Sequence, residues 1–308
     1  MEREKNEMKV HHTHYSGYKK DFFDMRNLLI ESYGKCDKPL NWLIGRLDNW
    51  RFAAFTVMIR KDPQFYQKNA HLWRTENNDL IGFFISENGR EYFELQIHPE
   101  YRFLEKEMLK WTIENWAQGK NQIITIFYKY DTARIRLFEK YNFECQGVVG
   151  FDYRYDTKNY TKGADIDSNF CIEAFSQSYE YENRIETERL TFSRDSLNRE
   201  WFETKALAPG YSSDWDLAVV SPDGQVVAFC LAWLDKKNKV AEIDPVGTHP
   251  DYRKRGLAKA LLTDCFIRLN RNGITKAHIQ GFSEPANRLY GSLMPVEKYE
   301  LLKYSLKL

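Results

Sequence analysis

The sequence lacks the features that most readily assign a chain to a class. Five of its 308 residues are cysteines, and they lie far apart, at Cys36, Cys145, Cys171, Cys230 and Cys265. None of them forms a C-x-x-C pair, so we expect neither a disulfide framework nor a zinc knuckle, and we predict no metal site. Widely spaced cysteines without a disulfide framework favour a reducing, cytoplasmic location for the protein.

Long apolar runs and a surplus of one charge are also missing. No apolar run reaches the about 18 residues that a membrane-spanning helix needs, and the first ten residues, MEREKNEMKV, lack the apolar core of a signal peptide. Lys plus Arg is 45 and Asp plus Glu is 44, which gives a net charge of +1. We therefore expect no membrane partner and no nucleic-acid partner bound through bulk charge.

The chain does have enough apolar residues for two cores, since hydrophobic residues make up 43% of it. At about 150 residues per domain, its length predicts two domains. Two segments also read alike, because His98–Arg102 is HPEYR and His249–Arg253 is HPDYR. Apolar runs upstream (80–85 and 226–231) and helical patterns downstream recur in the same order, which predicts a duplicated domain.

A polar stretch separates the two copies. Residues 155–188 include TKNYTKGADIDSN, which is rich in Gly, Asp, Asn and Thr and has little apolar periodicity. We place the boundary in this stretch, so that one domain covers 1–158 and the other covers 159–308.

The second half alternates between strand and helix patterns. Strands are predicted over 215–220, 225–234, 240–248, 274–280 and 297–308, and helices over 256–272 and 286–293. The longer helix repeats an apolar residue at every fourth position from Leu257 to Leu269 and ends at the stop signal Asn272-Gly273. Strands that precede and follow helices predict an α/β (α+β) fold with a mixed sheet and helices on both faces.

The turn before the longer helix, Arg253 to Ala258 (RKRGLA), is the most informative stretch. The first N–H groups of a helix are unpaired and carry a partial positive charge. Gly256 and Ala258 let a ligand approach that backbone closely, and three basic residues add charge. The turn therefore predicts a nest for a phosphate or pyrophosphate. The alternative is a solvated helix N-terminus.

Here the sequence resembles the GNAT family of acyl-CoA N-acyltransferases. The family motif Arg/Gln-x-x-Gly-x-Gly/Ala is matched by Arg253, Gly256 and Ala258. The next motif, Asn-x-x-Ala-x-x-x-Tyr-x-x-x-Gly-Phe, is matched in part, at Ala286, Leu289 and Tyr290. Two departures from it are Ser283 in place of the Asn and Met294-Pro295 in place of Gly-Phe. The resemblance is strong over about 213–295 and rests on layout alone over 20–155.

The resemblance implies two tandem GNAT-like domains, each a mixed, mostly antiparallel sheet flanked by helices. It also implies acetyl-CoA as cosubstrate and direct transfer of an acetyl group to a primary amine in a ternary complex. The acceptor, a small molecule or a peptide, is not identified by the sequence. The implied cofactor-binding residues are Val246, Gly247, Thr248, Arg253, Lys254, Arg255, Gly256, Leu257, Ala258 and Lys259.

Two side chains are candidates for the proton transfers of such a reaction. Tyr290 stands at the family's general-acid position, where a phenol can protonate a departing thiolate, and the alternative is a Tyr packed under the sheet. Glu242, on the strand before the turn, is the candidate base, with Asp244 as its substitute on the same strand face and a surface salt bridge as the alternative. The backbone N–H of Val246 is the candidate for polarising the thioester carbonyl. His249 is expected to be a loop or structural residue.

The N-terminal copy departs from this pattern. A shift of 151 residues puts Phe103–Glu107 (FLEKE) in place of residues 254–258 and Glu91 in place of Glu242. In the helix that follows, Leu137-Phe138 matches Leu289-Tyr290, so that Phe138 stands in place of Tyr290. One carboxylate about 5 Å from a phosphate charge costs about 3 kcal/mol at an effective dielectric of about 20. We predict that this half is a degenerate, non-catalytic copy that folds but does not bind CoA in this mode. We expect it to help wall the acceptor groove.

Two other hypotheses stay open. One is a catalytically silent acyl-CoA-binding or sensing protein, and the other is an interaction scaffold that binds no CoA. We expect a monomer or a weak homodimer. The HHTH segment at 11–14 is expected in a disordered N-terminus, and Trp42 and Trp50 are expected in a core.

Overall fold

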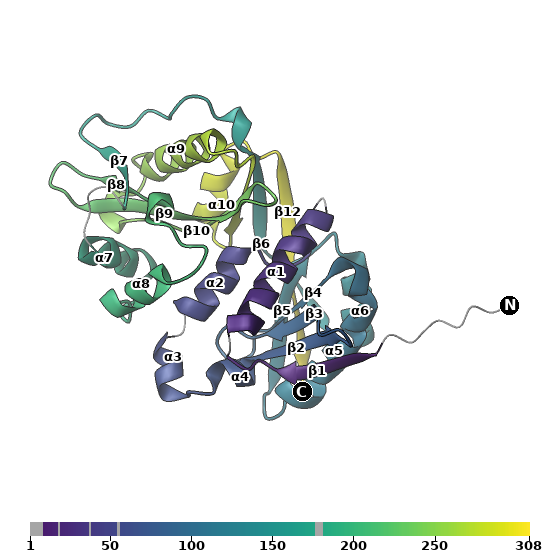
Figure 1. Cartoon of the computed structure of the whole chain (residues 1–308). Helices are drawn as coiled ribbons and strands as arrows, with labels where there is room; N and C mark the ends of the chain where they lie inside the picture. Colours follow the sequence, from purple (N-terminus) through teal and green to yellow (C-terminus); the bar gives the residue numbers. More distant parts are fainter. Residues whose placement is uncertain (1–8, 18, 37, 54–55, 176–180) are drawn as a thin grey trace. The chain divides into compact units, whose positions relative to one another are not determined.

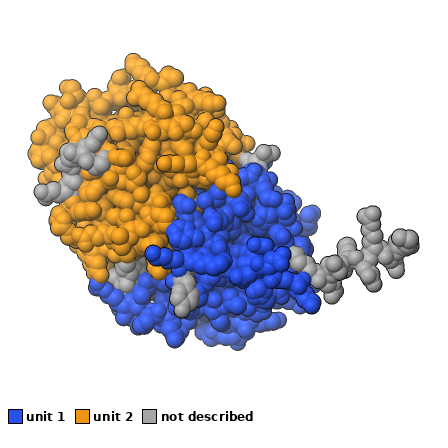
Figure 2. All heavy atoms as spheres, in the orientation of Figure 1, with its two compact units in different colours: residues 1–43, 57–147, 302–308 blue, residues 44–56, 148–301 orange. Residues whose placement is uncertain are grey.

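The computed structural model describes residues 9–17, 19–36, 38–53, 56–175 and 181–308, which form two compact units (Figure 2). Unit 1 contains residues 1–43, 57–147 and 302–308, and unit 2 contains residues 44–56 and 148–301. The division does not follow the order of the chain. Residues 44–56 lie in unit 2 although they come from the first third of the sequence, and the C-terminal residues 302–308 lie in unit 1.

Unit 2 is built on a mixed sheet with strand order β12-β6-β11-β10-β9-β8-β7 (Figure 1). These strands are β6 (Glu144–Asp156), β7 (Cys171–Ala174), β8 (Asp216–Val220), β9 (Val226–Asp235), β10 (Val240–Thr248), β11 (Lys276–Gly281) and β12 (Glu297–Lys307). Neighbouring strands pair antiparallel from β7 to β10 and from β11 to β6, whereas β10 and β11 pair in parallel. The predicted fold class, a mixed and mostly antiparallel sheet flanked by helices, is confirmed.

Helices cover both faces of this sheet (Figure 1). One face carries α9 (Leu257–Arg271) and α10 (Glu284–Gly291), and the other carries α2 (Ile44–Phe52), α7 (Tyr181–Phe192) and α8 (Arg199–Ala206). Successive residues of a strand point to opposite faces. Ala241 and Ile243 of β10 therefore pack in the core under α9, whereas Trp233 of β9 packs beside α2. No helix in the described part of the chain is long and apolar enough to cross a membrane.

Unit 1 has a four-stranded antiparallel sheet in the order β1-β2-β3-β4, and β5 lies beside the C-terminal part of β12. Its elements are β1 (Val10–His14), α1 (Lys19–Lys35), α3 (Thr56–Lys61), α4 (Phe65–Asn69), β2 (Ala70–Thr75), β3 (Leu80–Ile85), β4 (Glu94–Ile97), α5 (Glu105–Trp111), a π-helical turn (Thr112–Trp116), β5 (Gln122–Tyr128) and α6 (Thr132–Lys140). Aromatic rings fill much of its core, including those of Trp73, Phe84 and Phe93.

The prediction of a disordered HHTH segment is wrong, because residues 10–14 form β1, which pairs with β2. His12 Nδ1 lies 2.8 Å from Nε2 of the buried His71. Among the residues that the structure describes, no group of three or more His, Cys, Asp or Glu is arranged to hold a metal ion. Trp42 and Trp50 are both buried, as expected of core residues.

The observed division differs from the predicted boundary between 158 and 159. β6 continues without a break to Asp156, and its residues 151–156 pair with β11 of unit 2. Buried backbone groups need partners, so these residues must belong with the sheet they pair with rather than with a linker. The polar stretch that suggested a linker contains β7 and the start of α7. Its residues 176–180, like residues 1–8, lie outside the described part of the chain.

The two HPxYR segments adopt the same local structure in their separate units. His98 and His249 each precede a 3-10 helix (Pro99–Leu104 and Pro250–Tyr252), and in each case the histidine Nδ1 accepts the backbone N–H two residues on, at 3.3 Å. The ring of His98 lies edge-on to that of Tyr101, with 5.3 Å between the ring centroids. The ring of His249 lies edge-on to that of Tyr252 in the same way, with 5.5 Å between the centroids. This repeated cap supports a duplication and gives His249 a structural role.

Candidate active site

The predicted site of unit 2 lies where two parallel strands separate. The ladder between β10 and β11 pairs Val240–Glu242 with Lys276–His278 and extends no further. After a β-bulge between Ile243 and Val246, β10 continues beside β9 alone. Among the described residues, no strand lies along the other edge of Val246–Thr248. An extended ligand with amide groups can pair with such an edge.

The turn that follows β10 exposes backbone N–H groups. Lys254 and Gly256 have left-handed backbone conformations, with φ of 62° and 78°, and left-handed residues in such a turn direct successive amides toward one side. No side chain caps the N-terminus of α9, and a Cβ added at Gly256 would meet nothing within 4 Å. The amides of the first turn of α9 therefore border open space. This arrangement fits the pyrophosphate of a CoA molecule.

The basic side chains of the turn differ in what they contact. Arg253 donates from Nε to the Thr248 carbonyl and from Nη2 to the Thr191 carbonyl, both at 3.3 Å, so it fastens the turn to β10 and α7. Arg255 donates to the Asp251 carbonyl and lies over the Tyr252 ring. Lys254 and Lys259 are exposed. Leu257 is buried and Ala258 half-buried, so these two can offer a ligand their amides rather than their side chains.

Gly247 permits close packing at the end of β10. A Cβ there would lie 2.3 Å from Phe229 Cζ and 2.8 Å from Thr191 Cγ2. The strand can therefore approach β9 and α7 only because this residue has no side chain. The same packing fixes the positions of its neighbours Val246 and Thr248.

Tyr290 lies on α10, whose N-terminus is capped by Ser283, the residue that departs from the family motif. The phenol is buried, and burial raises its pKa well above the usual range, with the charge of Asp244 and the Cys230 thiol adding to this shift. In the described part of the chain, no group hydrogen-bonds to the Tyr290 hydroxyl. A neutral phenol of this kind can serve as a proton donor.

Glu242 points to the face of the sheet that α2 covers. Its Oε2 accepts the backbone N–H of Arg46 at 3.1 Å, and the Gly45 amide also bonds to it. Burial raises the pKa of Glu242 to about 8, the charge of Asp244 adds to this, and the two amides and the Arg46 charge oppose it. Asp244 itself is exposed at the bulge, where strict alternation along the strand is interrupted. A carboxylate with such a pKa can act as a base near neutral pH.

The corresponding turn of unit 1 is occupied by its own side chains. Glu105 is 3% exposed, and its carboxylate accepts from Arg134 Nε at 2.8 Å and from Arg102 Nη2 at 2.8 Å. Arg102 also binds Asp131 at 2.9 Å, so three buried residues and the half-buried Arg102 form a network with no net charge. Phe138, in place of the phenol, packs against Phe127. Glu107 is exposed.

The strand edge of unit 1 is occupied as well. The chain just before β4 forms a single parallel bridge with β5, between Tyr92 and Ile124, and β4 itself does not pair with β5. Asn41 fills this separation, because its Nδ2 donates to the Ile97 carbonyl at 2.7 Å while its Oδ1 accepts the Ile97 N–H at 3.0 Å. The Trp42 N–H bonds to Gln96 Oε1 beside it. The chain itself thus satisfies the backbone groups that correspond to the open edge in unit 2.

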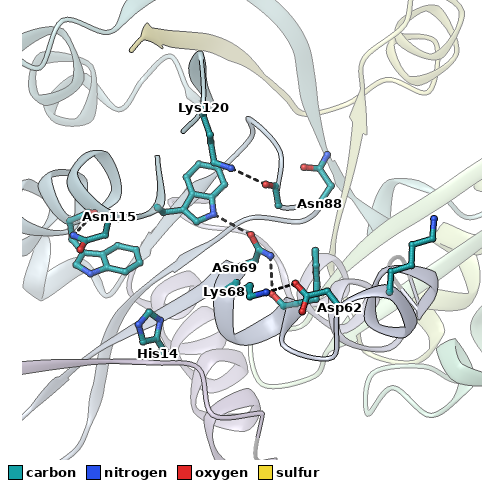
Figure 3. Close-up of a pocket in the computed structure, with 12 residues that line it drawn as sticks. His14, Asp62, Lys68, Asn69, Asn88, Asn115 and Lys120 are labelled. Carbon is teal, nitrogen blue, oxygen red and sulfur yellow. Dashed lines mark hydrogen bonds and ion pairs between the residues drawn. The ribbon is translucent and has the colours of Figure 1, made fainter. Parts of the chain in front are cut away.

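A cavity of about 600 Å³ in unit 1 lies elsewhere (Figure 3). None of the predicted site residues lines it. Its polar groups largely bind one another, since Trp116 Nε1 donates to Asn69 Oδ1, Lys120 donates to the Gly89 carbonyl, and Lys68 pairs with Asp62. The cavity therefore does not contribute to the predicted site.

Sequence reasoning missed three parts of these two sites. It did not identify α2 as the partner of Glu242, Asn41 as the partner of Ile97, or the buried pair of His278 with Asp152 that lies next to Glu242 in the β11 register. Each joins residues far apart in the chain, 196 positions in the case of Arg46 and Glu242. A glycine in an otherwise helical pattern, Gly45, was the one local signal of a close approach.

The comparisons with known proteins agree with this geometry. Residues 175–293 match the model of the acetyltransferase (GNAT) family. No curated protein matches the sequence. Among solved structures, the chain is similar to a GCN5-related N-acetyltransferase from Sphaerobacter thermophilus, with 17% identity, a TM-score of 0.62 and coverage of 97% of this chain and 96% of that one.

Two other solved structures share the fold. One is a tandem GNAT protein from the clavulanic acid biosynthesis pathway, with 10% identity, a TM-score of 0.63 and coverage of 97% and 98%. The other is a GNAT-family acetyltransferase from Colwellia psychrerythraea, with 12% identity, a TM-score of 0.60 and coverage of 97% and 100%. Residues 175–293 thus match the acetyltransferase (GNAT) family, and the chain as a whole shares the fold of a tandem GNAT protein.

Proposed function

We propose that unit 2 transfers an acetyl group from acetyl-CoA directly to a primary amine in a ternary complex. The observation that carries this proposal is the combination of an open β10 edge with an uncapped, left-handed turn at the start of α9. The first can pair with the amides of a pantetheine arm, and the second can bind a pyrophosphate. The lack of any disulfide among the five cysteines supports a reducing compartment such as the cytoplasm.

In this proposal each residue has one task. Acetyl-CoA supplies an activated thioester, and the amides of residues 254–259 bind its phosphates. Glu242 removes a proton from the acceptor ammonium, and the free amine then attacks the thioester carbon. The Val246 N–H stabilises the negative charge on the carbonyl oxygen. As the C–S bond breaks, Tyr290 gives its proton to the sulfur and recovers one from solvent, which leaves an N-acetyl amide and CoA with a free thiol.

We also propose that unit 1 does not bind CoA in this way. Glu105 and its two arginines fill the turn, and Asn41 occupies the strand edge. A CoA molecule would have to displace both sets of interactions. One segment of the N-terminal half, α2, instead contributes to the surroundings of Glu242 in unit 2.

A panel of amines incubated with acetyl-CoA tests the proposal, with release of free thiol as the readout. Tyr290→Phe should lower turnover about 100-fold or more while keeping CoA affinity. If no amine is acetylated but CoA binds, the protein is a silent acyl-CoA-binding protein instead. If calorimetry detects no CoA binding at all, the scaffold hypothesis replaces both.

The turn has its own test. Gly256→Glu should abolish CoA binding, because the carboxylate would stand beside the phosphates. Gly224→Glu is the matched control, since Gly224 also has a positive φ (82°) and open space beyond it but lies in the β8–β9 turn. Equal losses of CoA affinity in both variants would argue against a phosphate site at Gly256.

A further inference from the structure

The half-buried Glu242 meets the N-terminus of a helix on its side of the sheet. Arg46 and Gly45 are the third and second residues of α2, where backbone N–H groups have no partner inside the helix. Both amides bond to the Glu242 carboxylate, with Arg46 N at 3.1 Å from Oε2. Two of the free donors of α2 are therefore used by a residue 196 positions away.

Gly45 is the residue that allows this approach. A Cβ at Gly45 would lie 2.4 Å from Trp233 Cγ and 2.7 Å from Glu242 Oε2, distances that side-chain atoms do not adopt. Trp233 cannot easily move, because its Nε1 donates to the Asp244 carbonyl at 2.7 Å. α2 is also held by Asp48, whose Oδ2 accepts the Gly210 N–H at 2.9 Å. Only glycine fits between the indole and the carboxylate.

We infer that the N-terminus of α2 belongs to the active centre of unit 2. Its first amides orient the carboxylate of Glu242 and stabilise its charged form, and Gly45 is the positioning residue that makes this contact possible. The inference rests on the proposed function, in which Glu242 is the base. It assigns a role in that site to a segment outside residues 175–293, the family match.

The charges around Glu242 give the amides a defined effect. Asp244 on the same strand raises the pKa of Glu242, as burial does, and Arg46 on α2 lowers it. β9 contributes the uncharged Trp233, and β11 contributes His278, which is bound to Asp152.

α7, which also packs on β10, carries Arg184 and Glu188, which pair with each other. Burial and the Asp244 charge thus raise the pKa of Glu242, whereas the amides of Gly45 and Arg46 and the Arg46 charge lower it. Their loss must raise the pKa of Glu242 and leave less of it ionised at neutral pH.

The first test uses the full-length protein without any ligand. In the wild-type chain, the amide proton resonances of Gly45 and Arg46 should shift together as Glu242 ionises, with a midpoint near pH 8. Glu242→Gln should abolish this titration, because Gln accepts the same bonds without ionising. If the two amides show no titration that Glu242→Gln removes, the inference is wrong.

Two variant pairs measure the consequence. Arg46→Pro removes both the amide donor and the charge, whereas Arg46→Ala removes the charge alone, and proline is tolerated in the first turn of a helix. We expect the Glu242 pKa to be about one unit higher in Arg46→Pro than in Arg46→Ala. Gly45→Ala should raise it too, whereas Gly163→Ala, an exposed glycine with nothing within 4 Å, should not. Equal pKa values within each pair would overturn the inference.

The same variants separate this inference from the proposed function. With an acceptor from the amine panel, the rising limb of kcat/KM against pH should move to higher pH in Gly45→Ala and Arg46→Pro, in step with the measured Glu242 pKa. If the amide titration is present but no amine is acetylated, the contact with α2 stands and the transferase proposal fails. If acetylation occurs but its pH limb ignores these variants, Glu242 is not the base and the inference fails.

Discussion

At the scale of single residues, two opposing effects act on the pKa of Glu242. Its surroundings are dry enough to favour the protonated form, yet the protein places two amides against its carboxylate. A purely structural carboxyl group would gain more from a full ion pair. The pairing of burial with helix-terminal amides is the pattern expected of a group that must change its protonation state.

This burial predicts a pH-dependent stability. The folded-state pKa of Glu242 is raised from 4.5 to about 8, so the folded state holds the proton more tightly than the unfolded state. The stability that this proton confers is present below about pH 4.5 and is lost as the pH rises toward 8. Glu242→Gln cannot ionise, so it should be more stable than wild type by about 2 kcal/mol or more at high pH. Urea unfolding at acid and alkaline pH measures this, and a pH-independent difference would contradict it.

Glu105 in unit 1 differs from Glu242 because its charge is compensated by ion pairs. Its carboxylate lies between two guanidinium groups, and that of Arg134 is itself buried. Removing one partner of a buried ion pair leaves an uncompensated charge. Glu105→Ala should therefore lower the free energy of unfolding by about 3 kcal/mol or more, as measured with urea. Glu107→Ala, which changes an exposed neighbour, should stay within about 0.5 kcal/mol of wild type. Similar losses in both variants would show that the network is not stabilising.

At the scale of elements, the same strand–turn–helix arrangement has two outcomes. In unit 2 the strand edge and the helix N-terminus are open, whereas in unit 1 Asn41 and Glu105 fill them. The carboxamide of Asn41 bonds to both backbone groups of Ile97, as the amide of an extended ligand would. In unit 1, internal contacts thus occupy the positions that stay open in unit 2.

This replacement predicts a local effect of Asn41. Asn41→Ala leaves the buried N–H of Ile97 without a partner, at a cost of about 1–3 kcal/mol, and leaves its C=O with only the long 3.5 Å bond from Ser32 Oγ. We expect a lower melting temperature and faster hydrogen exchange at the Ile97 amide. Asn115→Ala removes an exposed carboxamide of the π-helical turn and should change neither. Unchanged exchange at Ile97 in Asn41→Ala would contradict the assigned role.

At the scale of the whole molecule, each unit is built from segments that are far apart in the sequence. Unit 2 takes α2 and residues 148–156 of β6 from the part of the sequence before residue 159, and unit 1 takes residues 302–308 from the C-terminal end. Neither half of the sequence therefore contains all of one unit. The family match at residues 175–293 covers the turn and the helices around it but not these contributions.

A fragment cut at the predicted boundary should consequently not fold. Residues 159–308 lack the β6 strand that pairs with β11 over Lys276–Gly281, and they lack α2 beside Glu242. The exposed edge of β11 and the uncovered Trp233 would favour aggregation. We expect no cooperative unfolding transition by circular dichroism for this fragment, and recovery of the transition when residues 1–158 are co-expressed with it. A soluble fragment that unfolds cooperatively on its own would disprove this.

The sequence by itself determined the features that depend on near neighbours. The apolar repeat from Leu257 to Leu269 with its stop at Asn272-Gly273 gave α9 to within a residue at each end, and β10 matches its predicted range. The turn around Gly256 was recognisable because its glycine, its basic residues and the helix after it are contiguous. The HPxYR repeat was visible for the same reason.

Only the tertiary structure decided which distant segments complete each site. The placement of α2 against Glu242, of Asn41 against Ile97, and of β6 beside β11 depends on backbone groups and buried volumes supplied from elsewhere in the chain. A local pattern fixes which face of a strand or helix is apolar, but many partners can satisfy that face equally well. The choice among them is made by packing of the whole unit, as the lack of space for any side chain at Gly45 illustrates.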